Sequence, residues 1–401
     1  MTSIRLQRVP MLVLGHVVLV QTIATAMRPT LSYGVLDLGG SPTVLGAVSA
    51  AFALPGVFLA LPAGHALDRL GERSLLVLGP TSVVAAALLV SFVGSSIAVL
   101  VLATALLGFG HLISLIGQQA MLANTTPSTR FDSIFGLYTF GASLGQTIGP
   151  TLLLLPGGTA RTPPLTLIFL TCAGLGVALL GLSMLMRSSA HRRSPSAPGM
   201  MGTASALLRT PGLRRSLIAT SIVLSSADIF IAYAPALGHD RGLSTAVISA
   251  MLVARSGMSM LSRLFLGPMV RTFGRRRLLI WTIGLSALSL GSVALPLPGI
   301  WLVVLSGVYG FVIGSCQPIT MSWVSDLSPP GSRGLAMSMR LTSNRVGQTV
   351  LPTTMGSLAA AAGAAGVLAA TAVLLVGAAW SSAAVPEAPT DDDASGPADF
   401  E

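Results

Sequence analysis

The ten residues GHALDRLGER, at positions 64–73, lie between two long apolar segments and decide how this chain is organised. A polar turn this short leaves the two flanking helices antiparallel and close together. Gly64 lets neighbouring helix backbones approach each other, and Gly71 permits the positive φ that reverses the chain. Asp68 and Arg69 fall where hydrocarbon gives way to water, so both side chains stay ionised.

A related stretch, GPMVRTFGRR at positions 267–276, appears 203 residues later and again follows the second apolar segment of its half. The repeat extends further, because GQTIGP at 145–150 matches GQTVLP at 347–352. A chain that repeats itself at half its length, in a membrane-protein composition, indicates a transporter built from two related helical bundles.

The composition assigns the chain to the membrane. Of its 401 residues, 52% are hydrophobic and 9% are charged, whereas a soluble globular chain carries about 25% charged residues. The net charge of +10 comes from arginines that lie mostly in the turns between apolar segments. This distribution fits membrane topology rather than a nucleic-acid partner. Cys172 and Cys316 fall inside apolar segments, so neither a disulfide framework nor a metal site is expected, and no nucleotide-binding fingerprint indicates a cofactor.

Apolar runs predict an all-α polytopic membrane protein with twelve transmembrane helices in two pseudo-symmetric bundles. A span needs about 20 residues, and the chain is long enough for twelve. The predicted helices cover positions 10–31, 43–63, 75–94, 97–121, 133–155, 165–186, 216–236, 245–267, 278–296, 300–324, 335–357 and 363–384.

These runs divide the chain into four parts. Residues 1–186 form an N-terminal six-helix bundle, and residues 216–385 form a C-terminal one. The segment 187–215 is rich in arginine, proline and glycine and is expected to be a cytoplasmic linker. The tail, 386–401, is acidic and poor in apolar residues, so it is expected to be disordered.

Arginine placement predicts the orientation. The N-terminal segment and the turns on its side of the membrane hold sixteen arginines, whereas the opposite turns hold Arg161 and Arg241. By the positive-inside rule both termini are cytoplasmic, in what we expect to be a bacterial inner membrane. The first apolar run, preceded by Arg5 and Arg8, also resembles a secretory signal peptide. Removing it would leave the first helix of the second half without its repeat partner, so we keep 10–31 as a span.

With these motifs the chain resembles a twelve-helix member of the major facilitator superfamily over nearly its whole length. The pattern of Gly64, Asp68, Arg69, Gly71 and Arg73 matches the family's signature loop between helices 2 and 3. The resemblance implies transport by alternating access, with this loop stabilising one access state and helices 3, 6, 9 and 12 facing lipid.

A second motif resembles one associated with antiporters in helix 5: Gly141, Gly145 and Gly149 at four-residue spacing, followed by Pro150. The trailing glycine pair of that motif is absent. Two other positions depart from the family pattern. Thr104 stands where drug–proton antiporters place an arginine, which argues against their usual proton-coupling scheme. Arg271 replaces the acid of the second signature loop, which leaves Asp68 as the motif acid available for a latch.

Six charged side chains fall inside apolar segments, on helices 1, 7, 8 and 11. A charge at the bilayer centre costs about 2.5–3.5 kcal/mol, so it should face protein or a water-filled cavity. Arg255 and Arg345 lie near mid-helix and line the substrate path or form structural salt bridges. Arg263 and Arg340 lie near the cytoplasmic ends, where snorkelling explains them. Arg28 lies near the outer end of helix 1, and the sixth charge is Asp228.

Asp228 is the only acid deep in an apolar segment. The repeat maps it onto Thr25, one turn from Arg28, so we expect Asp228 to pair with Arg28 when the outer side closes. Permanent pairing with Arg255 or Arg345 is the alternative. A carboxyl shielded from water can exchange protons, whereas a permanently paired one cannot. Asp228 is therefore the candidate for proton coupling.

Neutral side chains complete the candidate site. Gln118 and Gln317 fall on helices that the family fold places at the central cavity, so both are candidate substrate contacts, although most such residues merely bond across helices. Arg340, near the cytoplasmic end of helix 11, is a candidate partner of Asp68 in the latch.

The resulting hypothesis is a secondary transporter that moves a small organic molecule by alternating access. Four or five arginines against one acid favour an anionic or amphipathic acid, with proton exchange as the energy source, and the helix 5 motif favours export. An importer or symporter of an organic anion is the alternative. A membrane-embedded enzyme would need paired carboxylates, an activated nucleophile or metal-spaced histidines, and a sensor would need a soluble signalling domain. The expected partners are substrate, protons and lipid, and nothing requires more than a monomer.

Overall fold

The computed structural model describes residues 2–94, 96–126, 131–186, 209, 212–326, 333–358 and 362–383, and in these ranges the chain is helical without a strand. The first half contains α1 (Thr2–Asp37), α2 (Pro42–Leu70), α3 (Glu72–Val93), α4 (Ile97–Thr125), α5 (Phe131–Ile148), the short 3₁₀ helix η2 (Gly149–Leu154) and α6 (Leu165–Leu185). The second half contains α8 (Leu213–Asp240), α9 (Thr245–Phe273), α10 (Arg275–Val293), α11 (Gly299–Asp326), α12 (Arg333–Leu358) and α13 (Gly363–Ala383).

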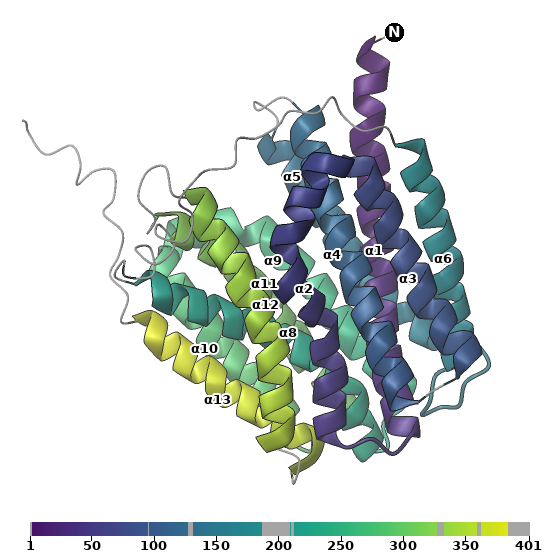
Figure 1. Cartoon of the computed structure of the whole chain (residues 1–401). Helices are drawn as coiled ribbons and strands as arrows, with labels where there is room; N and C mark the ends of the chain where they lie inside the picture. The colour runs from purple at the N-terminus through teal and green to yellow at the C-terminus, as the bar shows by residue number, and fades with distance from the viewer. Residues whose placement is uncertain are drawn as a thin grey trace, which may run out of the picture.

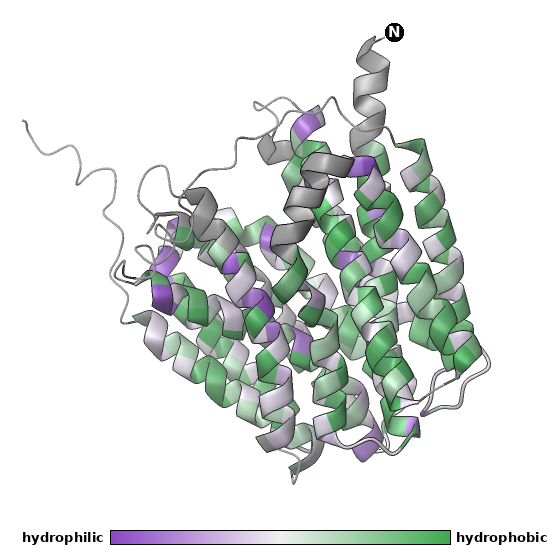
Figure 2. Cartoon of the chain, viewed as in Figure 1, coloured by the Kyte–Doolittle hydropathy of each residue, from purple (hydrophilic) through white to green (hydrophobic). Residues whose placement is uncertain are grey.

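Twelve long helices confirm the predicted count. Nine of them, within the described residues, are long and apolar enough to cross a membrane. The other three are α5, α10 and α12, of which α10 and α12 carry arginines. Figure 2 shows hydrophobic colouring along most of the helix surface, with hydrophilic turns at the helix ends and at a few central positions. The chain is therefore a multi-pass membrane protein.

The two halves repeat the same packing. α1 packs against α5 as α8 packs against α12, and α3 packs against α6 as α10 packs against α13. In Figure 1, α3 and α6 lie on one flank, and α10 and α13 lie on the opposite flank. Between the halves, α2 packs against α12, α5 against α9, and α1 against α8. The third, sixth, ninth and twelfth long helices, which are α3, α6, α10 and α13, therefore lie outermost, as the family resemblance implies.

The glycines of the helix 5 motif form the seam between α5 and α1. A Cβ added at Gly145 would lie 2.3 Å from the backbone oxygen of Val18, and one at Gly149 would lie 2.5 Å from that of Thr22. The equivalent glycine of the second half, Gly347, faces α8 as well, where an added Cβ would lie 2.0 Å from the side-chain hydroxyl of Ser221. The motif is thus a close-packing device within each half.

Another pair of glycines joins the remaining central helices. A Cβ at Gly108 on α4 would lie 1.9 Å from the backbone oxygen of Phe52 on α2. A Cβ at Gly310 on α11 would lie 2.0 Å from the backbone oxygen of Arg255 on α9. Phe52 and Arg255 are repeat-equivalent positions. The same backbone contact therefore fixes how α2 lies along α4 in the first half and how α9 lies along α11 in the second.

Three predicted helix ends were too early by six or seven residues. α1 continues to Asp37 rather than 31, α2 to Leu70 rather than 63, and α9 to Phe273 rather than 267. Polar residues at the membrane surface reach water with their side chains while their backbone keeps its helical hydrogen bonds. The turns after α2 and α9 shrink to the single residues Gly71 and Gly274. The positive φ predicted for Gly71 is confirmed, at 77°, and Gly274 has a similar φ of 74°. The side chains of Asp68 and Arg69 lie outside the described residues.

Hydrogen bonds join the two halves at the end of the molecule where α1 finishes and α2 begins, which we call the far end. The hydroxyl of Tyr233 on α8 donates to the backbone oxygen of Pro42 at 2.6 Å. At the same end, between α9 and η2, the hydroxyl of Ser249 donates to the backbone oxygen of Pro150 at 2.8 Å. Side chains and backbone from both halves therefore close the far end.

Candidate functional site

The two halves are joined in their interior by an ion pair between Arg28 on α1 and Asp228 on α8. Nη1 of Arg28 lies 2.6 Å from Oδ1 of Asp228, and the two side chains are 10% and 12% exposed. The sequence-based pairing of these residues is therefore found in the structure. The expected position of Arg28 near the end of its helix is wrong, because α1 continues for nine more residues, about 13 Å.

Gln348 on α12 links Asp228 to a second arginine. Its side-chain Nε2 donates to Oδ2 of Asp228 at 2.6 Å, and its Oε1 accepts from Nη1 of Arg345 at 3.3 Å. Both carboxylate oxygens of Asp228 therefore have a donor, and Arg345 reaches the carboxylate only through the amide. Charge-assisted bonds of this kind are among the stronger hydrogen bonds in proteins.

Aromatic side chains cover the other face of Arg28. Its guanidinium carbon lies 4.5 Å from the ring centroid of Phe52, a cation–π geometry. The ring of Phe52 in turn lies 5.3 Å from that of His111 on α4. Since Gly108 fixes the backbone of Phe52 against α4, this ring is a rigid support for the arginine.

Arg255 on α9 contributes a further cation to the same region. It is 7% exposed, donates to Oγ of Ser256 at 3.2 Å, and has a buried Nε without a partner. Arg28 and Arg345 bring two positive charges to the carboxylate of Asp228, one directly and one through Gln348, and the buried Arg255 adds a third cation to the interior.

Gly56 on α2 makes room for Arg345. A Cβ at this position would lie 2.7 Å from Cδ of Arg345 and 3.0 Å from its Nε. The arginine therefore lies across the bare backbone of the other half, which directs its guanidinium group to Gln348.

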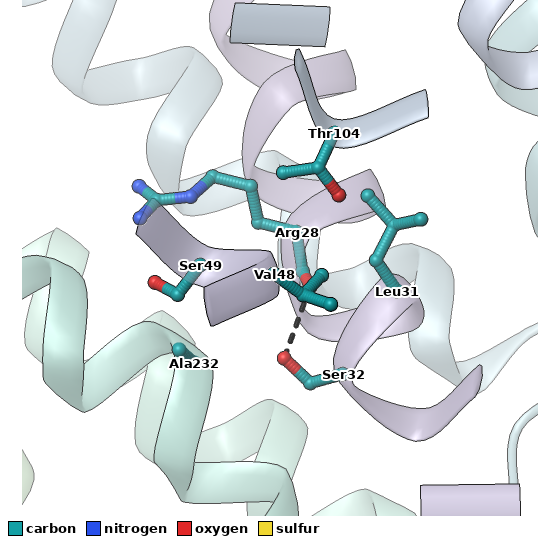
Figure 3. Close-up of a pocket in the computed structure, with 7 residues that line it drawn as sticks. All are labelled: Arg28, Leu31, Ser32, Val48, Ser49, Thr104 and Ala232. Atoms are coloured by element: carbon teal, nitrogen blue, oxygen red, sulfur yellow. Dashed lines mark hydrogen bonds between the residues drawn. The ribbon is translucent and has the colours of Figure 1, made fainter. Parts of the chain in front are cut away.

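A small pocket borders Arg28 (Figure 3). Apolar side chains alternate in its wall with hydroxyl groups, of which Ser49 has a buried oxygen without a partner. Thr104 lies in the same wall, so the position where related antiporters place an arginine is occupied here by a short side chain. The lining residues are Arg28, Leu31, Ser32, Val48, Ser49, Thr104 and Ala232.

Two arginines expected to snorkel do not. Arg263 lies ten residues before the end of α9 and donates to Oγ of Ser143 on α5 at 2.6 Å. Arg340 is 2% exposed, and its described bond is to the backbone oxygen of Gln317 at 3.4 Å. Their depth was underestimated because α9 extends beyond its predicted end and because Arg340 points into the bundle. Gln317 thus contributes its backbone to this bond, and the predicted partner of Arg340, the side chain of Asp68, lies outside the described residues.

Gln118 lies in a buried chain of hydrogen bonds within the first half. Its amide nitrogen contacts Nδ1 of His16 at 2.6 Å, and its oxygen accepts from the hydroxyl of Tyr138 at 2.9 Å. Nε2 of His16 completes the chain to Oγ of Ser183 at 3.0 Å. These hydrogen bonds join α1, α4, α5 and α6, and Gln118 is not brought together with the arginine cluster.

The signature-loop arginine that the structure describes binds its own half. Arg73 donates to the backbone oxygen of Met184 at the end of α6, at 3.3 Å. Arg276, its repeat equivalent, donates to that of Ala383 at the end of α13. A cation at a helix C-terminus satisfies free carbonyl groups and stabilises the helix dipole, so both arginines tie a loop to the last helix of their half.

Sequence reasoning missed the parts of the site that depend on helix rotation. Gln348 belongs to the repeated stretch GQTVLP at 347–352, but the repeat does not predict its bridging position. Phe52 and Gly56 carried no polar signal. For Gly56, the repeat with Ser259 would have indicated only that both positions are small.

The sequence profile of the Major Facilitator Superfamily matches residues 16–226 and 216–399. The chain belongs to this superfamily. No curated protein matches the sequence. As a member of this family the chain is a transporter and not an enzyme.

Solved structures share the fold. A mutant of the nucleoside transporter NupG has a TM-score of 0.78 at 14% identity, covering 94% of this chain and 98% of that one. A D-xylose-proton symporter has a TM-score of 0.75 at 15% identity, covering 94% and 97%. A mutant of the peptide transporter POT in complex with sulfate has a TM-score of 0.72 at 15% identity, covering 92% of each chain. At these identities the likeness establishes the twelve-helix architecture.

Proposed function

We propose that the chain is a secondary transporter that moves a small organic anion by alternating access. The observation that carries this proposal is the buried network of Arg28, Asp228, Gln348 and Arg345 between the halves, with Arg255 beside it. Burying a guanidinium group without a counter-charge costs several kcal/mol. An anionic substrate offsets this cost, whereas a cationic one increases it.

Asp228 is the proposed proton-coupling residue. Its bond to Arg28 crosses from one half to the other, so a proton on this carboxyl weakens a contact that joins the halves. Loss of that contact favours separation of the helices at the far end. The proton and the access state are thereby linked.

Two coupling schemes follow, and they differ in sign. The helix 5 motif favours export in exchange for protons, although in this structure its glycines form a packing seam. The charge distribution favours the alternative, symport, because a proton on Asp228 raises the positive charge that attracts an anion. Transport into proteoliposomes with the pH gradient in each direction separates the schemes. Symport requires the anion to accumulate on the alkaline side, and exchange requires the acidic side.

The first test replaces Arg345. We expect Arg345→Ala to raise the apparent KM at least tenfold, because a bond to a charged group contributes about 1.5–3 kcal/mol. Arg345→Lys should recover only part of the affinity, since lysine lacks the planar fork that binds a carboxylate at two points. Unchanged affinity in alanine variants of both Arg255 and Arg345 would refute the anion site.

The second test replaces Asp228. Asp228→Asn should keep substrate binding and exchange between the two sides but lose accumulation driven by a pH gradient. A purely structural ion pair predicts instead that the variant folds poorly, because removing one partner of a buried pair costs about 3–5 kcal/mol. Thermal unfolding of the purified variant distinguishes the two results. A stable variant that still concentrates substrate would assign coupling elsewhere.

The remaining parts of the proposal concern placement. We place both termini in the cytoplasm of a bacterial cell, in agreement with the arginine bias, so that the far end faces outward. The division into bundles at 1–186 and 216–385, joined by a linker at 187–215 and followed by an acidic tail at 386–401, belongs to the same proposal, as does a monomeric state in the lipid bilayer. The latch role of Asp68 and Arg340 remains a proposal that Asp68→Asn tests through its transport rate.

A further inference from the structure

His111 on α4 is a buried titratable side chain that the proposed network leaves unused. It is 9% exposed, and its Nδ1 is buried without a hydrogen-bond partner among the residues that the structure describes. Buried polar atoms in folded proteins are nearly always bonded, so an unpaired one calls for an explanation. Histidine is the side chain that ordinarily gains or loses a proton between about pH 5 and 8. The unpaired ring nitrogen is therefore available to accept a proton.

An aromatic contact connects His111 to the ion pair. Its ring centroid lies 5.3 Å from that of Phe52 on α2, and the same Phe52 ring lies 4.5 Å from the guanidinium carbon of Arg28. The backbone of Phe52 is held against Gly108, three residues before His111 on α4. Arg28 in turn bonds to Asp228 at 2.6 Å. One fixed ring thus contacts both the imidazole and the guanidinium group.

The charges around His111 are positive. By the two ring distances its imidazole lies within about 10 Å of the guanidinium carbon of Arg28, where one positive charge disfavours a second by about one pH unit. Arg345, the other arginine of the network, also acts on His111 electrostatically. Of the other helices packed against α4, α2 and α5 have no charge on their described side chains. The charges of α3 lie in its first turn, where Glu72 bonds to Asn124, thirteen residues along α4 from His111 and about 20 Å away.

His16, which is also buried, has no free ring nitrogen. Its Nδ1 lies 2.6 Å from the amide nitrogen of Gln118, and its Nε2 lies 3.0 Å from Oγ of Ser183. The hydroxyl of Ser183 donates its one hydrogen to the backbone, with the oxygen of Leu76 at 2.6 Å, so it accepts from Nε2–H. Nδ1 then accepts from Gln118, and a second proton on the ring would face an N–H group. His16 is thereby held neutral, in contrast to His111.

We propose that His111 is a second proton-binding side chain of the transporter, which takes up its proton when a substrate anion offsets the charge of the arginines. This inference rests on the proposed transport of an anion and adds a coupling residue to it. The proton comes from water on the side where the anion enters and returns to water where the anion leaves. Because coupling between two ligands is reciprocal, the proton strengthens anion binding as much as the anion strengthens proton binding. Proton and anion then move in the same direction, which is symport.

The first measurement needs no substrate. The full-length protein is labelled with nitrogen-15 histidine, its ring signals are followed by NMR from about pH 4 to 9, and His111→Gln assigns the signal of interest. We expect Arg345→Gln to move proton uptake by His111 to a higher pH by about half a unit or more, because it removes a positive charge and leaves the ion pair intact. Arg277→Gln, at an exposed position at the start of α10, is the matched control and should change nothing. The signal of His16 should stay that of the Nε2–H form throughout.

The second measurement uses acetate, lactate and methanesulfonate, which stay ionised between about pH 6 and 8. Their Kd values are obtained from ligand-induced stabilisation of the purified protein. At least one of these anions should bind about tenfold more tightly at the lower pH, as a coupling of about one pH unit requires. His111→Gln should lose most of this pH dependence. His239→Gln, whose side chain is 64% exposed, should keep it.

The outcomes separate this inference from the function on which it rests. If His111 titrates identically in the wild type and in Arg345→Gln, or stays neutral throughout with and without anions, it is not a proton site and anion transport stands. If anion binding keeps its full pH dependence in His111→Gln, the coupling role is wrong. If none of the three anions binds while the titration shifts as expected, His111 keeps its proton-binding role and the anionic substrate is what fails.

Discussion

At the scale of single residues, the site is shaped by a missing side chain as much as by its charges. Gly56 has no polar group, yet its bare backbone decides where Arg345 lies. Through Gln348 this position reaches Asp228, so a glycine on α2 of the first half influences a carboxylate on α8 of the second. Such a residue acts through another and is a positioning residue.

Gly56→Ala should weaken substrate binding severalfold while leaving the protein folded. The added Cβ would lie 2.7 Å from Cδ of Arg345, and this flexible side chain moves away more easily than backbone does. The measurement is KM and kcat in proteoliposomes, with KM expected to rise more than kcat falls. Gly257→Ala is the matched control, since its nearest contact, a methyl group of Thr147 in the other half, is at an ordinary 3.7 Å. Equal KM values in the two variants would contradict the positioning role.

At the scale of helices, glycine contacts set how closely neighbouring backbones approach. Gly145 and Gly347 occupy equivalent places in the two halves, on α5 against α1 and on α12 against α8. Helices in lipid associate through such close packing because the apolar environment supplies no hydrophobic driving force between them. The seam is therefore a source of stability within each half.

Gly145→Ala should destabilise the protein by about 1–3 kcal/mol, the usual cost of overpacking. Its Cβ would lie 2.3 Å from a backbone oxygen, which cannot move without shifting a helix. Gly136→Ala on the same helix has nothing within 4 Å of its Cβ and should be neutral or stabilising by about 0.5–1 kcal/mol. Thermal unfolding in detergent compares the two variants. The same change in stability in both variants would show that the close contact at Gly145 does not contribute to the stability of α5.

Helices were the part of the structure that the sequence predicted best. Each apolar run became a helix because a segment in lipid must satisfy its backbone hydrogen bonds internally. Depth was predicted less well. Arg28, Arg263 and Arg340 were placed relative to helix ends that in α1 and α9 lie six residues further on, so three buried arginines were taken for boundary residues.

The pairing of Arg28 with Asp228 was predictable because the repeat puts positions 25 and 228 at matching depth. The bridge through Gln348 was not, since it depends on the rotation of α12 about its axis and on the reach of an amide. Phe52 beneath Arg28 is another case: its ring supports a cation, but nothing in an apolar run distinguishes it from a lipid-facing phenylalanine.

At the scale of the whole molecule, the far end holds the halves together around Tyr233. This side chain is fully buried, and its hydroxyl lies between Gly46 and Gly356, where an added Cβ would come within 2.8 Å and 2.5 Å of it. Its bond to Pro42 crosses from the second half to the first. The bond exists only while the far end is closed, so it stabilises that access state over the other.

Tyr233→Phe should shift the population towards a far end that is open. One hydrogen bond contributes about 0.5–1.5 kcal/mol, which corresponds to a shift of roughly two- to tenfold. Ser49→Cys reports the shift through its rate of labelling by a membrane-impermeant maleimide, against a low background because Cys172 and Cys316 are buried. Tyr138→Phe is the control, since the hydroxyl of Tyr138 binds within one half. Identical labelling rates in the two variants would exclude a role of Tyr233 in the equilibrium.

The 2.6 Å contact between Arg28 and Asp228 also bears on what the protein does when it has nothing to carry. A membrane that stores energy as a pH difference loses it through any carrier that ferries protons without cargo. Here the contact joins the two halves at the one carboxylate proposed to carry the proton, so the empty protein must break it before Asp228 can move between the two access states. Copies without substrate would then leak few protons, and a cell could keep them in its membrane without dissipating the pH gradient.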